Sequence, residues 1–254
     1  MNMRTLLAVP TKGRIDTIGK DTLAWLPAAA KKMERDWILA VEPQEAKLYE
    51  KFYPQWKENL LILPENNKGL TYSLIKIKEY AIAHSYEAVF KIDDDMRGWY
   101  GRERKSGNTL KAFTRGLGAC EEMLLRASTG IMAVSFPYSN HMFEVEKEWS
   151  ERGRLQTCYL IRPEWWYLNP KMKDNDDFSA FISLRFQGFE VFRYNWLGMV
   201  CKPVAKNPGG LQMFNRRDTM IESNAILRQE FPDLKFRKVE GKPWDEEPDM
   251  RSVP

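Results

Sequence analysis

Hydrophobic and polar residues alternate in blocks along the first half of the chain. Short apolar runs that stop at a proline or an acidic residue predict buried strands, at residues 5–9, 37–41, 60–63, 88–92 and 131–136. Apolar residues at helical spacing predict helices between these strands, at residues 18–26, 44–52, 70–81 and 110–124. This alternation indicates βαβ units, and therefore an α/β fold with a mostly parallel central sheet that helices cover on both faces.

The second half of the chain is less regular. Its patterns predict two strands and two helices, at residues 155–161, 190–196, 177–187 and 218–231. The whole sequence of 254 residues is within the range of one large α/β domain. We therefore expect a single domain over residues 1–240. Residues 241–254 are rich in proline and charge, and we expect them to form a loose C-terminal tail.

Composition indicates where the protein works. The sequence has no run of about 18 apolar residues, so no membrane-spanning helix is expected. The apolar run at the N-terminus stops at Pro10 and lacks a small-residue cleavage site, so it is not typical of a signal peptide. Cys120, Cys158 and Cys201 share no metal or redox spacing, so buried free thiols are expected. Together these features favour a cytoplasmic protein.

The charge of the chain is mildly positive. A formal net charge of +4 fits a polyanionic partner without requiring one. Basic residues concentrate in two stretches, at residues 97–111 and 216–238. Either stretch alone is equally consistent with a solvated surface.

The sharpest chemical feature is the sequence KIDDDM, in which a predicted strand runs directly into Asp93, Asp94 and Asp95. Ligands of such sheets bind outside the carboxyl ends of the strands. In an extended chain Asp93 and Asp95 point to one side and Asp94 points to the other. Two carboxylates on one side offer the oxygen ligands that Mg²⁺ or Mn²⁺ prefers, and such an ion keeps positions open for substrate phosphates. A charged turn after a strand is an equally weighted alternative.

A second acidic cluster, Asp174-Asn175-Asp176-Asp177, opens the helix predicted at residues 177–187. Acidic residues at this position cap a helix and complement its dipole, which is sufficient to explain Asp174 and Asp176. Two acidic clusters at element boundaries also suit a division of labour, with one for a metal and one for acid–base chemistry or acceptor binding. Asp176 and Asp177 are therefore the candidate catalytic residues.

Four segments of the chain, in this order, resemble the GT-A glycosyltransferases. They are VPTKGR, ENNKGLTYSLIKIKEYAI, VFKIDDDM with the family's Asp-x-Asp metal motif, and NDDFSAFISLRFQGFEV. Many members add a histidine ligand late in the chain, whereas this chain has only His84 and His141. A third metal ligand would then be water or another carboxylate. Nucleotidyltransferases share this sheet type, but they carry a glycine-rich loop for which Lys12-Gly13 is too short.

This resemblance implies a UDP-sugar donor, Mn²⁺ or Mg²⁺ as cofactor, and roles for individual residues. Asp95 would bind the metal, Asp93 would contact the metal or the ribose, and Asp94 would lie beside them. The donor site would also include Pro10, Thr11, Arg14, Glu42, Lys68 and Gly69. Asp176 or Asp177 would face the acceptor, where inverting members have their general base.

Within this fold, the chain most resembles phage glycosyltransferases associated with TET-like hydroxylases. The compact domain, KIDDDM without a later histidine motif, and the turn KNPGGLQ carry this resemblance. It implies transfer of a hexose to 5-hydroxymethylcytosine in DNA, and a location in the host cytoplasm if a phage encodes the protein. The acceptor and DNA contacts would come from Arg102, Arg104, Lys105, Tyr138, His141, Trp165, Asn207, Gly209, Gly210, Arg216 and Arg217.

Two other functions stay open at this point. One is a GT-A enzyme that acts on a glycan, a protein or a small molecule, and the other is an inactive member that only binds nucleotide sugars. Hydrolysis of a nucleotide sugar with Mn²⁺ separates the enzymes from the inactive module. Salt-dependent DNA binding separates an enzyme that modifies DNA from one that does not.

Overall fold

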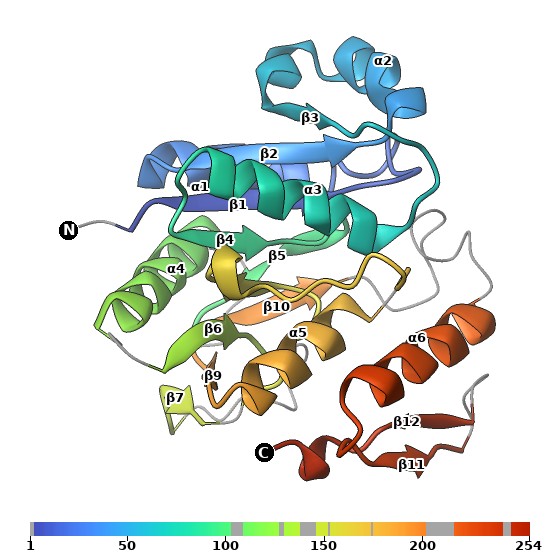
Figure 1. Cartoon of the computed structure of the whole chain (residues 1–254). Helices are drawn as coiled ribbons and strands as arrows, with labels where there is room; N and C mark the ends of the chain where they lie inside the picture. Colours follow the sequence, from blue (N-terminus) through green and yellow to red (C-terminus); the bar gives the residue numbers. More distant parts are fainter. Residues whose placement is uncertain are drawn as a thin grey trace.

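An eight-stranded sheet lies at the centre of the fold, with strand order β3-β2-β1-β4-β8-β6-β9-β7 (Figure 1). The computed structural model describes residues 3–102, 109–126, 130–137, 146–151, 153–173, 175–201, 216–240 and 245–254. The strands of the sheet are β1 (Thr5–Pro10), β2 (Asp36–Val41), β3 (Leu60–Ile62), β4 (Ala88–Lys91), β6 (Ile131–Ser135), β7 (Trp149–Ser150), β8 (Tyr159–Ile161) and β9 (Glu190–Tyr194). Only β8 and β7 run against the others. The expected α/β fold with a mostly parallel sheet is confirmed.

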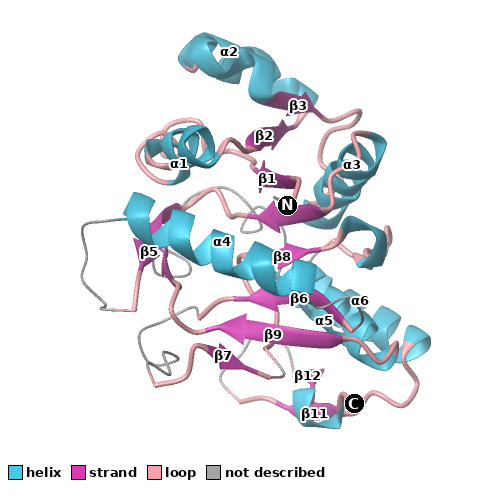
Figure 2. Ribbon diagram, turned by 90° about the vertical axis from the view of Figure 1, so that its left-hand side faces the viewer, coloured by secondary structure: helices cyan, strands magenta, loops and turns pink. Residues whose placement is uncertain are grey.

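Helices cover both faces of this sheet (Figure 2). One face carries α1 (Leu26–Met33) and α4 (Thr109–Arg126), and the other carries α3 (Leu70–Ala83), α5 (Asp176–Phe186) and α6 (Arg216–Glu230). The helix α2 (Pro43–Phe52) lies beside β3. Successive residues of a strand face opposite sides, so each strand supplies both cores and reads as a continuous apolar run. No helix in the described parts of the chain is long and apolar enough to cross a membrane.

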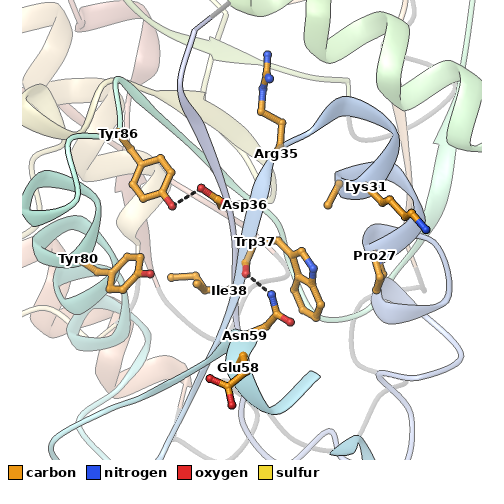
Figure 3. Close-up of a pocket in the computed structure, with 11 residues that line it drawn as sticks. Pro27, Lys31, Arg35, Asp36, Trp37, Ile38, Glu58, Asn59, Tyr80 and Tyr86 are labelled. Carbon is orange, nitrogen blue, oxygen red and sulfur yellow. Dashed lines mark hydrogen bonds between the residues drawn. The ribbon is translucent and has the colours of Figure 1, made fainter. Parts of the chain in front are cut away.

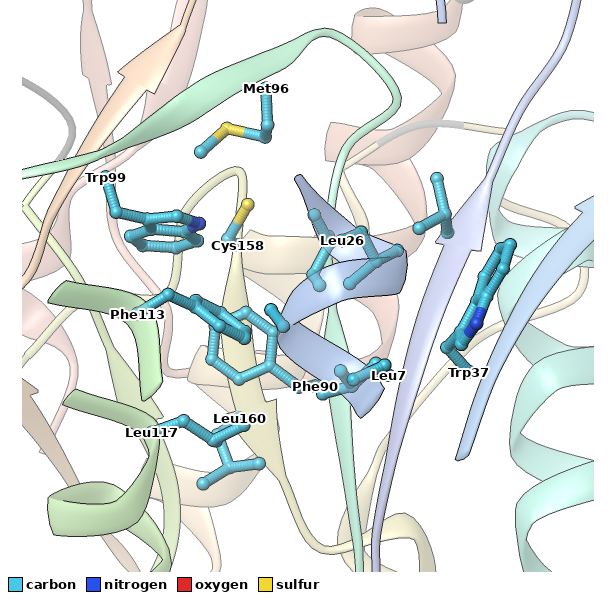
Figure 4. Packing of buried hydrophobic residues seen from close by; sticks show 14 of the residues in the cluster. Leu7, Leu26, Trp37, Phe90, Met96, Trp99, Phe113, Leu117, Cys158 and Leu160 are labelled. Carbon is cyan, nitrogen blue, oxygen red and sulfur yellow. The ribbon is translucent and has the colours of Figure 1, made fainter. Parts of the chain in front are cut away.

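Aromatic rings fill the core on the side of α1 and α4 (Figure 4). The ring centroids of Phe90, Trp99 and Phe113 lie 5.4–5.8 Å from one another. Trp99 belongs to β5 (Met96–Tyr100), which pairs antiparallel with β10 (Gly198–Cys201) in a separate two-stranded sheet. Because β5 begins directly after Asp95, this packing anchors the chain where it leaves the acidic sequence.

The C-terminal segment is folded where the structure describes it. β11 (Phe236–Lys238) pairs antiparallel with β12 (Glu246–Pro248), and the side chain of Arg185 donates a hydrogen bond of 2.7 Å to the carbonyl of Pro254. The prediction of a loose tail is therefore wrong for residues 245–254. The composition rich in proline and charge suggested a loose tail, but charges of this segment find partners, as Glu247 does with Arg237 and Asp249 does with Arg251.

The helix predicted at residues 18–26 is also wrong. Residues 15–21 form turns, a short 3₁₀ helix spans Thr22–Ala24, and α1 begins only at Leu26. The predicted helix ended directly before Pro27. Proline is tolerated in the first turn of a helix, where its missing N–H has no intrahelical partner to lose, so Pro27 lies in the first turn of α1 instead of ending a helix before it.

Candidate active site

The candidate site forms where β1, β2 and β4 end. β1 ends at Pro10, and the hydroxyl of the next residue, Thr11, donates a hydrogen bond of 2.8 Å to Oδ2 of Asp94. The same hydroxyl lies 3.0 Å from the hydroxyl of Tyr49 on α2. The loops after two adjacent parallel strands are thereby joined, as expected for the carboxyl edge of such a sheet.

The loop after β2 joins this cluster through Glu42. Oε1 of Glu42 accepts hydrogen bonds of 2.9 Å from the ammonium of Lys12 and from the backbone N–H of Asn67. Lys12 also donates to the side-chain oxygen of Asn67 at 2.6 Å. The segments after β1, β2 and β3 therefore meet around one buried carboxylate, and the structure brings together the predicted donor residues Pro10, Thr11, Glu42 and Asp94.

The turn before α3 is held close to the segment that leads into α5. Gly69 has a φ of 92°, and a Cβ at this position would lie 3.2 Å from the backbone oxygen of Lys173. Such a backbone conformation favours glycine. Lys68 is half exposed and pairs with Glu65 at 2.9 Å.

The three aspartates of KIDDDM do not continue the strand. Asp94 and Asp95 lie in a turn between β4 and β5, so strand alternation is not what orients their side chains. The side chains nevertheless differ in exposure, at 32% for Asp93, 11% for Asp94 and 22% for Asp95. Thr22 fixes the turn, because its hydroxyl donates to the carbonyl of Asp93 at 2.6 Å and accepts from the N–H of Met96 at 3.0 Å.

Arg14, in the loop after β1, is a cation that faces this turn. Its Nε lies 3.6 Å from Oδ1 of Asp94, and its Nη2 lies 3.8 Å from Oδ2 of Asp95. Nε and Nη1 are buried and have no hydrogen-bond partner among the described residues. Burial raises the pKa of Asp94 to about 7, although the charge of Arg14 and the hydrogen bond from Thr11 both lower it.

A buried lysine joins the acidic turn, formed by Asp93, Asp94 and Asp95, to the second acidic cluster. The ammonium of Lys91 lies 2.6 Å from Oδ1 of Asp93, 3.9 Å from Oδ2 of Asp176, and 2.8 Å from the carbonyl of Thr157. Burial by itself lowers the pKa of Lys91, but the charges of Asp93 and Asp176 outweigh burial and raise it. Lys91 therefore stays charged, at a position where a lysine is rarely found without partners.

The two candidate catalytic residues differ in their surroundings. Asp176 is buried and accepts a hydrogen bond of 2.8 Å from the hydroxyl of Tyr159, which accepts one of 3.2 Å from Nε1 of Trp166. Asp177 is only half buried, and its carboxylate accepts the N–H of Phe178 at 2.8 Å in the first turn of α5. Burial lowers the pKa of the half-buried Arg154, and the negative charge of Asp177 partly offsets this lowering. Of the two carboxylates, Asp177 is the more accessible to a substrate.

A sequence model described as TET-associated glycosyltransferase matches residues 5–210. The chain belongs to this family. It is therefore a glycosyltransferase, as the sequence motifs suggested. No curated protein sequence matches this TET-associated glycosyltransferase.

Solved structures share the fold of this TET-associated glycosyltransferase at low sequence identity. A mannosyltransferase from Pyrobaculum calidifontis, in complex with GDP-Man and Mn²⁺, matches with a TM-score of 0.54 and 14% identity over 89% of this chain and 65% of its own. S. aureus TarS 1–349 in complex with UDP-GlcNAc gives 0.51 and 16%, over 89% and 67%. A mycobacterial protein gives 0.52 and 12%, over 97% and 83%. These likenesses confirm the GT-A fold alone, and the chain spans just under two thirds of the mannosyltransferase.

The predicted acceptor residues are only partly placed by the structure. Trp165 follows β8, whose last residue pairs with the amino end of β4. The ring of Trp165 packs against Phe189, with 4.5 Å between the centroids. Trp165 therefore does not join the aspartates at the carboxyl end of β4. Arg102 is exposed and lies over the ring of Trp196 at 4.4 Å. α6 begins at Arg216, and Arg217 is exposed in its first turn. The other predictions lie outside the described residues, and they are Arg104, Lys105, Tyr138, His141, Asn207, Gly209 and Gly210.

Sequence reasoning missed several residues of this site as site residues. Lys91 had a usable signal, because a lysine inside the apolar run of a buried strand requires partners. Thr22, Tyr49 and Tyr159 had none, since their contacts with the aspartates or with Thr11 depend on segments far apart in the sequence. Within the described residues, no group of three or more His, Cys, Asp or Glu side chains is arranged to hold a metal ion.

A cavity of about 410 Å³ lies at the opposite end of the sheet (Figure 3). It is lined by Asp36 and Trp37 at the start of β2, and by Tyr80 and Tyr86 at the end of α3 and just beyond it. The hydroxyl of Tyr86 donates a hydrogen bond of 2.7 Å to Asp36. β2 begins at this cavity and ends at the edge of the sheet where the acidic turn lies. This cavity is therefore not part of the candidate active site.

Proposed function

We propose that this TET-associated glycosyltransferase transfers a hexose from a UDP-sugar to the hydroxyl group of 5-hydroxymethylcytosine in DNA, with Mn²⁺ or Mg²⁺ as cofactor. Membership of the family carries the proposal, because the family is described as TET-associated, and the resemblance to such enzymes implies 5-hydroxymethylcytosine as the acceptor. Two proteins of the same fold support the donor class, since one binds GDP-Man with Mn²⁺ and one binds UDP-GlcNAc.

In this proposal the donor lies at the carboxyl ends of β1 and β2. Pro10, Thr11 and Arg14 line the nucleotide, with Glu42 near the uracil or ribose, and Lys68 and Gly69 lie near the diphosphate or sugar. Arg14 supports this assignment, because its buried Nε and Nη1 have no hydrogen-bond acceptor in the described parts of the chain and a ligand oxygen would satisfy them.

The residues of the acidic turn fit a hard divalent cation. Asp93 and Asp95 supply oxygen ligands and are the more exposed of the three aspartates. Two protein carboxylates leave positions for the donor diphosphate and water, which such ions commonly retain. When bound, the cation would stabilise the negative charge of the departing nucleoside diphosphate.

The acceptor hydroxyl needs a group that takes its proton. We assign Asp177 as this general base, because it is more exposed than Asp176 and lies in the first turn of α5, which Lys91 connects to the acidic turn. The hydroxyl oxygen forms a bond to C1 of the sugar, the bond from C1 to the diphosphate oxygen breaks, and the proton passes to the carboxylate. Asp176 is instead engaged by Tyr159 and Lys91.

The DNA backbone would be contacted by basic residues around the site. Arg102 and Arg217 are exposed, and Arg104, Lys105 and Arg216 are their neighbours in the sequence. A base in a duplex must be turned out of the stack, at a cost of a few kcal/mol, and phosphate contacts offset this cost. Tyr138, His141, Asn207, Gly209 and Gly210 remain our candidates for holding the extruded base.

The decisive experiment incubates hydroxymethylated and unmodified DNA with several UDP-sugars and Mn²⁺, followed by digestion to nucleosides and mass spectrometry. We expect a hexose-mass adduct on hydroxymethylcytosine alone, and DNA affinity that falls steeply with salt. Donor hydrolysis without an adduct on any DNA would overturn the acceptor assignment.

Two variants test the proposed roles within the site. Asp95→Ala should abolish Mn²⁺-dependent binding of the UDP-sugar in calorimetric titrations, and unchanged affinity would overturn the metal assignment. Asp177→Asn should reduce turnover far more than donor binding, because a general base acts mainly in the transition state. Near-normal turnover of both Asp177→Asn and Asp176→Asn would mean that the cluster is only a helix cap.

A further inference from the structure

We propose that Lys91 is a positioning residue that locks the donor half of the active site to the acceptor half. It does so by holding Asp93 of the acidic turn and Asp176 at the start of α5 in one cluster around its buried ammonium. This inference rests on the proposed function for the roles of the neighbouring residues, Asp95 and Asp177. The cluster itself stands on the geometry of the described residues.

The ammonium of Lys91 has two partners at hydrogen-bond distance and a third at ion-pair distance. An ammonium has three N–H donors and no acceptor. Here it reaches the carboxylate of Asp93 at 2.6 Å, the carbonyl of Thr157 at 2.8 Å and the carboxylate of Asp176 at 3.9 Å, while the side chain is only 3% exposed. These partners come from three separate parts of the chain. A single side chain therefore connects β4, the segment before β8, and the start of α5.

Asp176 has a second partner besides Lys91. The oxygen that faces Lys91, Oδ2, also accepts the hydroxyl of Tyr159, and Tyr159 is held by Nε1 of Trp166. The side chain of Asp176 is 6% exposed. Oδ2 of Asp176 is therefore held by Tyr159 and lies next to the charge of Lys91.

Two functional consequences follow from this arrangement. Because Lys91 holds Oδ1 of Asp93, it fixes the rotation of a carboxylate that we assign to the metal. Because Lys91 and Tyr159 hold Asp176, they fix the first residue of α5, and the direction of the next residue, Asp177, is set by that helix. Residues that orient a metal ligand typically change metal affinity or activity by 10–100-fold when they are removed.

The test compares three variants with a matched control. Lys91→Met removes the charge and keeps much of the volume, and Lys91→Met combined with Asp176→Asn also removes a carboxylate that the first change leaves buried without its cation. Lys91→Arg keeps the charge with a different shape. Arg35→Met is the control, because Arg35 forms a similarly buried ion pair with Glu121 at the amino end of β2.

We expect folded Lys91→Met to bind UDP with Mn²⁺ about 10–100-fold more weakly and to lose turnover by a similar factor. The combined variant should regain stability against urea without regaining nucleotide affinity, and Lys91→Arg should recover part of the affinity. Arg35→Met should lose stability with unchanged nucleotide affinity. Wild-type affinity in Lys91→Met, or full recovery of affinity in the combined variant, would overturn the positioning role and leave charge compensation alone.

Hydrogen exchange tests the cluster without any ligand. Lys91→Met should increase exchange at the start of α5 and in the turn after β4 together, whereas α4 should be unchanged. Absence of this paired increase would overturn the proposed link. If the wild-type protein bound no UDP-sugar, the proposed function would fail while the exchange experiment would still decide the role of Lys91.

Discussion

Replacement of Asp94 by asparagine tests how strongly the fold disfavours a charge at this position. The side chain of Asp94 is 11% exposed, and burial raises its pKa from 3.8 to about 7 in spite of Arg14 and Thr11. The folded protein therefore holds this proton more tightly than the unfolded chain does. The stability that the proton contributes is fully present below about pH 4 and is lost as the pH rises through about 7.

The size of the effect follows from this difference in pKa. Between about pH 4 and 7 the folded state binds one more proton at Asp94, so the free energy of unfolding falls by about 1.4 kcal/mol per pH unit. Asparagine has no titratable proton, and its side-chain oxygen can still accept the hydrogen bond from Thr11. Relative to the wild type, Asp94→Asn should therefore gain up to about 4 kcal/mol of stability between pH 4 and pH 8.

The assay is urea unfolding followed by circular dichroism at several pH values, with a chelator present so that no cation binds the neighbouring carboxylates. Glu79→Gln is the control, since Glu79 is exposed on α3 and pairs with Lys76. Its effect should stay within about 0.5 kcal/mol throughout. If the stability difference between Asp94→Asn and the wild type is the same at pH 4 and pH 8, the reasoning about burial is refuted.

Two further changes test the framework around the site by the same unfolding measurement. Gly69→Ala should lower the free energy of unfolding by about 1–3 kcal/mol, because the φ of 92° and the backbone of Lys173 leave no strain-free place for a Cβ; an unchanged free energy would contradict this. Glu121→Gln should cost about 3 kcal/mol, because it breaks a mostly buried pair in which Arg35 donates to both carboxylate oxygens at 2.9 Å and 2.8 Å. The nucleotide affinity of Glu121→Gln should stay at the wild-type value, and a loss of affinity would show that this pair is coupled to the site.

The first half of the fold could be predicted because its strands are buried on both faces. The strands predicted at residues 5–9, 37–41 and 88–92 agree with β1, β2 and β4 to within one residue at either end. Strands of this kind read as unbroken apolar runs, so the hydrophobic pattern alone locates them.

The second half could not be predicted in the same way because long-range pairing decides it. β8 has only three residues, Tyr159–Ile161, and inserts antiparallel between β4 and β6. The predicted strand began at residue 155, since local pattern carries no information on which residues find a partner. β5 and β10 pair across about 100 residues of sequence, and neither was predicted.

The site shows the same boundary between local and long-range information. Sequence position identified the aspartates and the strand end that carries them, because the carboxyl edge of a parallel sheet is where ligands bind. Sequence position also set Asp94 apart from Asp93 and Asp95, although the reason given, alternation along a strand, was wrong. The chain turns at Asp94 instead of continuing as a strand. Asp94 is buried because Thr11 and Arg14, in the loop after β1, approach it.

This difference in partners separates the effects expected from the three aspartates. Asp94 is bound to the framework through Thr11, so its replacement should change stability and its pH dependence first. Asp95 has 22% of its side chain exposed and lies at the longer distance of 3.8 Å from Arg14, so its replacement should change ligand binding first. Asp93 combines the two, because it is 32% exposed and yet held by buried Lys91 at 2.6 Å. A variant of Asp93 should therefore lose both stability and Mn²⁺-dependent affinity. Lys91→Met should show the same two losses together, and Asp93 is the one aspartate of the three for which this is expected.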